Sequence, residues 1–402
     1  MTAVDQVVER APRRPPEDRD ATQPASALNE TERAILAQIM GAQTTMRSEI
    51  SARLSVSKAT ISAGMKRLLT AGLVTELGVA HGGGLGRPAG VYRVSEQAGC
   101  CLAIDLGTTR VWVRVIALDG RILGEAQEKI RASSADVSKG QLRAARKLTA
   151  EIRSILDEHQ TRVRGCVIAA PVKVSLDTPE PPRLAPVFEA VRALPTTPDL
   201  AITVENNVNC AAIAEGQEGV AQGRATFAYL QVGVKIGLGF VYEGRLLRGR
   251  GGAGEVACLP YPWGTGTRPT HLALEHHIGS AGLLARARAR DDIPMAPRTD
   301  VAALFARAAQ GEPGPRELVA AHAREIGEAA AAIVALLDPG LIVLGGGVGS
   351  NPILLRGVRH EIRRLAWDTE LANGRLGSDA TIIGASRLAT EAARRAVLAG
   401  GY

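Results

Sequence analysis

Features that mark membrane-spanning and secreted proteins are missing from this sequence. No apolar run reaches the length needed to cross a bilayer, and the N-terminus has no apolar signal-peptide core. The 5 cysteines are scattered, at positions 100, 101, 166, 210 and 258, and they form no CxxC pair. Such a set is typical of buried thiols in a reducing compartment. We therefore expect a cytoplasmic protein without membrane contact.

Positive charge is what the chain has in excess. Its 402 residues carry 48 Lys and Arg against 41 Asp and Glu, and the formal net charge of +7 is spread along the chain. This balance favours anionic partners, and the length allows two or three domains. Residues 1–27 are polar and rich in proline, which predicts a disordered tail.

Residues 46–73 have the pattern of a helix-turn-helix. A first helix is expected over Arg47–Leu54 and a second over Lys58–Ala71, with Ser57 as the N-cap and Gly72 just past the C-terminal end. The second helix has apolar residues on one stripe and hydroxyls and cations, without carboxylates, on its outer face. A helix that lies in a DNA major groove requires such a face.

Two strands and a glycine-rich loop complete the pattern. Residues 73–77 and 90–94 alternate like the strands of a hairpin, and residues 82–88 between them form the tip of a wing. Arg87 in that tip is expected to enter a minor groove, and an amphipathic helix over Asn29–Met40 completes a small core. The predicted DNA-binding residues are Arg47, Ser57, Lys58, Thr60, Ser62, Lys66, Arg67 and Arg87.

The charge of this region agrees with a DNA-binding interpretation. Residues 41–95 contain seven Lys or Arg against two acids, an excess that suits a phosphate backbone. The alternative is an ordinary helical hairpin with a solvated basic face. Helix, turn, helix and wing follow one another in the expected order and at the expected lengths, which favours the winged helix.

The body after residue 97 contains two similar halves. Residues 101–123 and 229–247 each predict a strand, a loop with glycine, a second strand, an acid-Gly turn and a third strand. This repetition predicts a duplicated α/β architecture. Further elements are expected as strands over Val163–Ala169, Ala201–Val204 and Leu341–Leu344, and as helices over Pro315–Leu337 and Ser386–Leu398.

Asp105–Thr109, Val204–Asn209 and Gly254–Cys258 carry motifs of one known family. With the winged helix before them, they make the chain resemble the ROK family of repressors, open reading frames and sugar kinases, over about residues 28 to 399. The resemblance implies an α/β, actin-like body of two lobes preceded by a small winged helix-turn-helix domain. In the family's kinases a sugar lies between the lobes, ATP binds beside it, and a carboxylate takes the proton of the sugar hydroxyl.

The resemblance also implies where the domains begin and end. The winged helix-turn-helix occupies residues 28–96, and the body occupies 97–402. Within the body, the lobes are expected at about 97–214 and 215–385, with a C-terminal helix over 386–399 that packs back on the first lobe.

One loop in each half resembles a phosphate loop of the family. In the first, Asp105–Thr109, the resemblance implies that a carboxylate helps to place a metal-bound phosphate while glycine and threonine donate hydrogen bonds. The second is altered, because Val234 replaces a hydroxyl donor and Lys235 replaces a glycine, although an ammonium can still attract an anion. Gly345–Gly347 resembles the loop where a nucleotide approaches the backbone, or it is a plain tight turn. The residues of the vestigial phosphate loops are Asp105, Gly107, Thr108, Thr109, Gly233, Lys235 and Gly237.

The largest departure from the family lies at Asn207. The family has an aspartate there, which is the general base, and an amide cannot accept the proton near neutral pH. Losing a general base costs about 10²–10⁴-fold in rate, whereas Asn207 can still hydrogen-bond a sugar hydroxyl, with Asn206 beside it in the same cleft. In the alternative interpretation, both asparagines simply cap a helix that starts near Asn209.

The zinc site of the family is missing as well. The family has a Glu-x-Gly-His motif and then a CxCGxxGCxE pattern, but Cys258 replaces the histidine and residues 260–275 contain no cysteine. Glu255 and Glu275 match the glutamates of these motifs, so the resemblance implies that they contact a sugar. The conceivable replacement ligands are Cys258, His271, His276 and His277. Their spacing matches no common template, so we expect no metal.

Together these features predict a DNA-binding regulator, acting as a repressor in carbohydrate metabolism and without kinase activity. Its expected partners are a double-stranded DNA operator and a sugar or sugar-phosphate effector, and no cofactor is expected. The expected effector ligands are Asn206, Asn207, Glu255 and Glu275.

We expect a homodimer, or a dimer of dimers, that holds two winged helices at a palindromic spacing. The short segment Ser95–Gly99 would join each winged helix to a body that closes around its ligand. Two alternatives remain open. One is a bifunctional ATP-dependent sugar kinase and regulator, and the other is a DNA-binding protein whose body binds no ligand.

Overall fold

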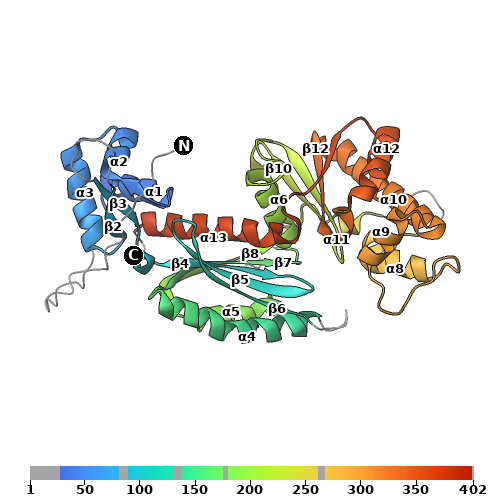
Figure 1. The fold of residues 1–402 in the computed structure, drawn as a ribbon, viewed down its shortest axis with the longest axis horizontal. Helices are drawn as coiled ribbons and strands as arrows, with labels where there is room; N and C mark the ends of the chain where they lie inside the picture. Colours follow the sequence, from blue (N-terminus) through green and yellow to red (C-terminus); the bar gives the residue numbers. More distant parts are fainter. Residues whose placement is uncertain (1–27, 81–88, 131–136, 175–179, 261–267, 401–402) are drawn as a thin grey trace.

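The structure is a computed structural model that describes residues 28–80, 89–130, 137–174, 180–260 and 268–400. The predicted tail, the tip of the wing and its Arg87 lie outside these residues. No helix within the described ranges is long and apolar enough to cross a membrane. Figure 1 shows three parts in a row, which are a small N-terminal domain and two larger lobes.

The N-terminal domain is a winged helix. Its elements are α1 (Glu30–Met40), β1 (Thr45–Met46), α2 (Arg47–Leu54), α3 (Lys58–Thr70), β2 (Val74–Ala80) and β3 (Ala89–Val94), with a sheet of order β1-β3-β2. The predicted N-cap is confirmed, because the Ser57 side chain accepts a hydrogen bond from the Thr60 amide. Helix α3 ends one residue earlier than expected, at Thr70, and Gly72 follows with a φ of 69°. An L-residue rarely adopts that left-handed conformation, so glycine suits this stop.

Helices α1 and α3 of this domain pack very closely. A Cβ atom built on Gly64 of α3 would lie 2.6 Å from Cδ1 of Ile35 on α1, so only glycine allows the observed approach. Asn29 caps α1 through a capping box with Glu32. The apolar stripe predicted for the second helix is confirmed at Ile61, Met65 and Leu68, which are buried, whereas Leu69 is only half-buried.

The first lobe is a five-stranded sheet of order β6-β5-β4-β7-β8. Its elements are β4 (Cys100–Leu106), β5 (Arg110–Ala117), β6 (Ile122–Lys129), α4 (Val137–Glu158), β7 (Val163–Ala170), α5 (Ala185–Arg192) and β8 (Thr196–Asn206). Strands β4, β7 and β8 are parallel, and β5 and β6 are antiparallel to their neighbours. Helices α4 and α5 cover one face, and their apolar side chains form a core with that face.

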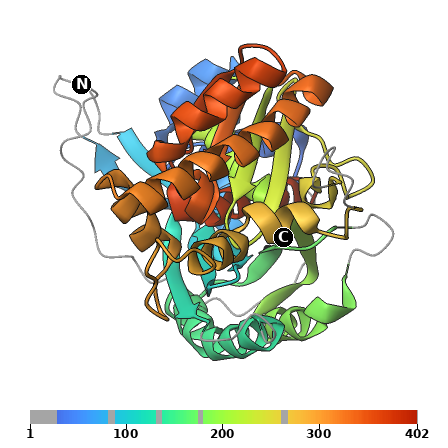
Figure 2. The same ribbon diagram turned by 90° about the vertical axis from the view of Figure 1, so that its right-hand side faces the viewer.

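The second lobe repeats this arrangement, with a sheet of order β11-β10-β9-β12-β13. Its elements are β9 (Phe227–Val232), β10 (Ile236–Tyr242), β11 (Arg245–Leu246), α7 (Ala273–Ile278), α8 (Ser280–Arg288), α9 (Val301–Ala309), α10 (Pro313–Leu337), β12 (Leu341–Gly345), α11 (Gly346–Gly349), α12 (Leu355–Leu365) and β13 (Glu370–Asn373). The two sheets have matching order and matching strand directions, so the predicted duplication is confirmed. In the turned view of Figure 2, the orange and red helices of this lobe lie above the green helices of the first.

Two helices connect the lobes. Helix α6 (Asn207–Gln217) leaves β8 of the first lobe and packs on β9 and β10 of the second, and α13 (Ala380–Leu398) leaves the second lobe and packs on β4 and β7 of the first. The C-terminal helix was expected from Ser386, but it begins at Ala380. It does pack back on the first lobe, and Figure 1 shows its far end beside the winged helix.

Helix α13 joins the winged helix to the body through an apolar core. Ala393 and Val397 of α13 belong to one continuous apolar cluster with Ile35 and Ile39 of α1 and with Trp112 of the first lobe. Because buried apolar contacts hold these elements together, the winged helix is packed against the body and does not hang from a linker.

Candidate DNA-binding face and interlobe cleft

The outer face of α3 is the candidate DNA-binding surface. The six predicted residues on this helix and its cap are all exposed: Ser57, Lys58, Thr60, Ser62, Lys66 and Arg67. The hydroxyls of Ser57 and Thr60 lie 2.8 Å apart, and the Ser57 hydroxyl also caps the helix by accepting a hydrogen bond of 3.2 Å from the Thr60 amide. Neither Lys58 nor Lys66 forms an ion pair with a residue that the structure describes. Their ammonium groups are therefore available to an anionic partner.

Two predicted DNA-binding arginines also have partners within the winged helix. Nη1 of Arg67 lies 3.0 Å from Oε1 of Glu32, a carboxylate that is almost fully buried in the capping box of α1. The guanidinium of Arg47 lies over the ring of Tyr92 on β3, 5.0 Å from its centroid. Both side chains stabilise the domain, a role that the sequence pattern did not reveal.

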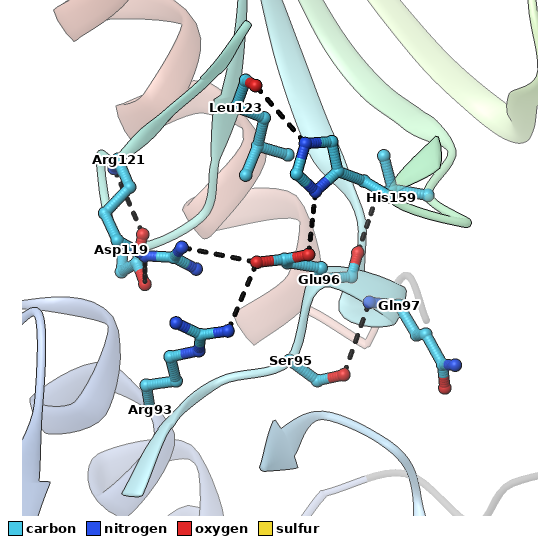
Figure 3. Close-up of polar contacts among 9 residues, drawn as sticks. Arg93, Ser95, Glu96, Gln97, Asp119, Arg121, Leu123 and His159 are labelled. Carbon is cyan, nitrogen blue, oxygen red and sulfur yellow. Dashed lines mark hydrogen bonds and ion pairs between the residues drawn. The ribbon is translucent and has the colours of Figure 1, made fainter. Parts of the chain in front are cut away.

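The segment between the winged helix and the body is held by a polar cluster around Glu96 (Figure 3). The Glu96 carboxylate accepts hydrogen bonds from Arg93 at 3.3 Å and from Arg121 at 3.2 Å, and it lies 2.9 Å from Nδ1 of His159. Asp119, whose side chain is buried, accepts a hydrogen bond from Arg121 in turn. The backbone carbonyl of Glu96 accepts a hydrogen bond of 2.6 Å from the Thr161 hydroxyl.

The charge of Glu96 is stabilised by these contacts. Partial burial alone would raise the pKa of Glu96, but the hydrogen bonds and charges of His159 and Arg121 outweigh it and lower the pKa below its usual value. The carboxylate therefore stays ionised and keeps three cationic or polar side chains together. This segment, expected only as a short connection, is a fixed joint.

A cleft of about 500 Å³ lies between the lobes. Three loops from distant parts of the sequence meet there. They are the first phosphate-type loop, Asp105–Thr109, the second phosphate-type loop, Gly233–Lys235, and the glycine loop after β12, Gly345–Gly347. The predicted residues that line it are Asp105, Gly107, Thr108, Thr109, Asn207, Gly233 and Lys235. Gly346 and Gly347 also line it, and Gly346 has a φ of 81°, so this loop faces the cleft and is more than a surface turn.

A smaller hollow of about 160 Å³ adjoins the cleft, since Asn207 and Lys235 line both. The other predicted residues that line it are Asn206, Gly237, Glu255 and Glu275. The structure therefore assembles every residue of the predicted ligand set in two adjoining hollows. Their role in binding stays a prediction.

The two asparagines at the end of β8 have different roles in the structure. Asn206 is the N-cap of α6, because its Oδ1 accepts a hydrogen bond of 2.8 Å from the Val208 amide, and its Nδ2 donates to the Val172 carbonyl at 3.1 Å. The helix expected near Asn209 begins at Asn207. The interpretation that both residues are caps is therefore wrong for Asn207, whose half-buried side chain lines the cleft.

Lys235 forms an ion pair inside the cleft. Its Nζ lies 2.9 Å from Oε1 of Glu275, and Oε2 of that carboxylate accepts a hydrogen bond of 3.1 Å from the Ile236 amide. The Lys235 ammonium thus has a carboxylate partner but stays half exposed at the cleft, so its attraction for an anion stays a prediction. Two contacts therefore join the altered phosphate-type loop to the predicted sugar ligand Glu275, the ion pair with Lys235 and the hydrogen bond from the Ile236 amide.

Two carboxylates in these hollows are held in an unfavourable environment for their charge. Burial raises the pKa of Asp105 to about 7, against the opposing charge of Arg110. Partial burial and the neighbouring Glu275 raise the pKa of Glu255, with Lys173 opposing. A ligand that offers a cation or a hydroxyl donor to either carboxylate would relieve this cost.

Arg110 is a residue of the cleft that sequence reasoning missed. Its Nη2 donates to the Ser378 carbonyl at 2.8 Å and lies 3.4 Å from Oδ1 of Asp379, directly before α13. Arg110 thus connects the first phosphate-type loop to the start of α13. Its position next to the Asp105–Thr109 motif was the only signal in the sequence.

No metal-binding group is assembled by the part of the chain that the structure describes. No three His, Cys, Asp or Glu side chains come together there in a way that could hold an ion, and Cys258 is exposed. Residues 261–267, within the stretch that lacks the family's cysteines, lie outside the described ranges.

Comparisons with known proteins agree with this architecture. The model of the ROK family matches residues 101–392. A beta-glucoside kinase from Klebsiella pneumoniae is 27% identical over 293 residues, which cover 70% of this chain and 93% of that protein. A protein named "Putative xylose repressor", from Caldicellulosiruptor sp. strain Rt8B.4, is 29% identical over 235 residues, which cover 55% of this chain and 56% of that protein.

A solved structure matches the winged helix and the body together. It is a crystal structure of a ROK family transcriptional regulator, a homologue of the E. coli MLC protein, with a TM-score of 0.65 and 22% identity. The match covers 92% of this chain and 98% of that one. It confirms the predicted fold, two α/β lobes preceded by a small domain of helices and strands.

Proposed function

The chain belongs to the ROK family, and on that premise we propose that it is a DNA-binding transcriptional repressor without kinase activity. One observation carries the proposal, which is the exposed face of α3 in the winged helix, where Lys58 and Lys66 form no ion pair with any residue in the described ranges. Hydroxyls and cations without a carboxylate are the groups that meet bases and phosphates in a major groove. Curated relatives include a kinase and a repressor, so the family alone does not decide between these functions.

Asn207 supports the absence of phosphoryl transfer. It stands at the start of α6 and lines the cleft where the resemblance places a general base. A neutral amide donates and accepts hydrogen bonds but does not take up a proton near neutral pH. We therefore assign the cleft to binding of a sugar or sugar phosphate, with genes of carbohydrate metabolism as the expected targets.

Helix α13 provides the connection from cleft to DNA in this proposal. Ser378 and Thr381, at its start, line the cleft, and Val397, near its end, lies in the apolar cluster shared with α1. A ligand that favours one arrangement of the lobes would shift α13 and with it the winged helix. Such a ligand changes DNA affinity only by its differential affinity for the two arrangements.

The expected DNA target is a palindrome bound by a homodimer or a dimer of dimers. The full chain should select a defined site from a pool of random double-stranded DNA, and footprinting should show two protected half-sites. If no sequence is enriched, the proposal of a DNA-binding repressor fails. If a monomer protects a single half-site at full affinity, the proposed dimer is wrong.

A bifunctional sugar kinase is the second candidate, because the cleft keeps Asp105 and a glycine loop at Gly346–Gly347. A coupled ADP assay with hexoses, N-acetyl hexosamines and pentoses separates the two. We expect no sugar-dependent ADP release by the wild type. Sustained turnover that Asn207→Ala abolishes would establish the kinase instead.

A further inference from the structure

A third hollow, of about 370 Å³, lies on the first lobe away from the cleft. It is bounded by β7, β8, the start of α6, the loop after β11 and α13. Among the described residues, none that lines it also lines the cleft or the adjoining hollow. Its size is within the range of small-molecule sites, which begins at about 300 Å³. The proposed sugar-dependent regulation does not use it.

The wall formed by α13 is mainly apolar. Leu388, Ala392 and Arg395 line the hollow, and their spacing of four and three residues places them on one stripe of the helix. At 1.5 Å of rise per residue, this stripe is about 10 Å long. Val167 of β7 also lines the hollow, and it belongs to the apolar cluster that α13 covers.

The two arginines of the hollow differ in their contacts. Nε of Arg248 donates to Oε2 of the buried Glu205 at 2.7 Å, and Oε1 of Glu205 is bonded to Asn206 and Asn209. Arg395 is exposed, and its side chain has no hydrogen bond or ion pair with any residue in the described ranges. The hollow therefore offers an apolar surface with an available guanidinium on its α13 wall.

We propose that this hollow binds a small amphipathic carboxylate. Its apolar body would lie on Val167, Leu388 and Ala392, and its carboxylate would pair with Arg395. A carboxylate suits a guanidinium, which presents paired donors. A sugar does not suit the apolar wall, because its hydroxyl groups would lose water without gaining partners.

The position of this site gives it access to the winged helix. Arg395 lies on α13 two residues before Val397, which is part of the apolar cluster shared with α1. A bound carboxylate therefore contacts the helix that holds the winged helix against the body. Binding of a carboxylate is tested without DNA or sugar. Its failure can therefore be distinguished from failure of the proposed function.

Octanoate is a suitable probe, since its chain is comparable in length with the apolar stripe. We expect calorimetric titration of the full chain to show one octanoate site, with octan-1-ol binding more weakly. Arg395→Ala should weaken octanoate about tenfold or more, as expected for loss of a charge-assisted hydrogen bond. Ala392→Phe, which fills the hollow, should abolish binding.

Arg387→Ala is the matched control, because Arg387 is exposed on the same helix and contacts Gln217 outside the hollow. It should bind octanoate as the wild type does, and thermal unfolding should show that all three variants are folded. No octanoate binding by the wild type, or binding that neither Arg395→Ala nor Ala392→Phe changes, would overturn the proposal.

Discussion

The winged helix and the interlobe cleft use their charged side chains in opposite ways. On α3, Lys58 and Lys66 face solvent without an acidic partner in the described chain. In the cleft, Lys235 is paired with Glu275, and Asp105 is buried where its charge is costly. The first region has cations available to an external anion, whereas the second, with its adjoining hollow, has Lys235 paired and holds carboxylates whose charge burial makes costly.

This difference is consistent with the proposed function, in which a kinase-like body serves a regulator. Three loops and the start of α6 surround the cleft, but an amide stands where the family resemblance implies a base, and the Lys235 ammonium is paired with Glu275. Shape without the proton acceptor favours binding over turnover. The four predictions below test the comparison, from the largest effect to the smallest.

Asp105→Asn tests the cost of charge in the cleft. The folded pKa of about 7 lies above the unfolded value of 3.8, so the folded state holds the extra proton between these pH values and the wild type loses stability as pH rises from about 4 to about 7. Asn cannot ionise. Its free energy of unfolding should match the wild type at pH 4 and exceed it at pH 8, by up to about 4 kcal/mol. Urea unfolding at both pH values measures this, and parallel pH profiles would contradict it.

Reversing the charge on the exposed face of α3 tests the other region. The double variant Lys58→Glu, Lys66→Glu should bind the selected DNA at least about 100-fold more weakly at low salt, since it replaces phosphate attraction with repulsion. Its dependence on salt should also become shallower. The control pair Arg316→Glu, Arg356→Glu changes the net charge equally on the exposed surface of α10 and α12. Equal loss in both doubles would remove α3 from the interface.

Glu96→Gln tests the joint between the two regions. The amide keeps the size of the side chain but loses the charge that holds Arg93, Arg121 and His159, so stability at pH 7 should fall by about 1–3 kcal/mol. Because the folded pKa of Glu96 is lowered, the wild type should lose this advantage as pH falls through that value, below 4.5. Glu128→Gln, at an exposed pair with Lys147, is the control. A difference that persists unchanged at low pH would refute the electrostatic explanation.

Lys235→Met tests whether the ion pair controls ligand choice. Without the ammonium, Glu275 is free to accept hydroxyl groups, so neutral sugars should bind more tightly relative to sugar phosphates. A shift of about tenfold in that ratio corresponds to one charge-assisted hydrogen bond. Calorimetry with matched pairs, such as a hexose and its 6-phosphate, measures the ratio. If the ratio is the same in both proteins, Lys235 does not select the ligand.

The three helices of the winged helix and its strands β2 and β3 could be predicted from local sequence, whereas the short strand β1 could not. Its helices follow from apolar spacing, and their ends follow from caps such as Asn29 and Ser57, which act within a few residues. The start of α13 was missed although Ser378 and Asp379, residue types preferred at N-caps, directly precede Ala380. In the structure the Asp379 side chain makes no cap hydrogen bond.

The internal contacts of the cleft could not be predicted in this way. Lys235 and Glu275 are 40 positions apart, and Arg110 and Asp379 are 269 apart, so only the folded chain brings them together. The family resemblance identified the residues that line the cleft, but not that Lys235 and Glu275 neutralise each other. The same holds for α13, whose contact with α1 joins the two ends of the chain.

The central claim is that the cleft senses a ligand and that DNA binding is the only output. Its most direct test is to titrate the full chain with its selected DNA against a panel of sugars and sugar phosphates, with ATP and Mg²⁺ present and ADP measured in the same samples. We predict that at least one compound changes the DNA affinity by about 5–150-fold, while ADP stays at the protein-free background. Steady ADP release, or a DNA affinity that no compound changes, would contradict the account.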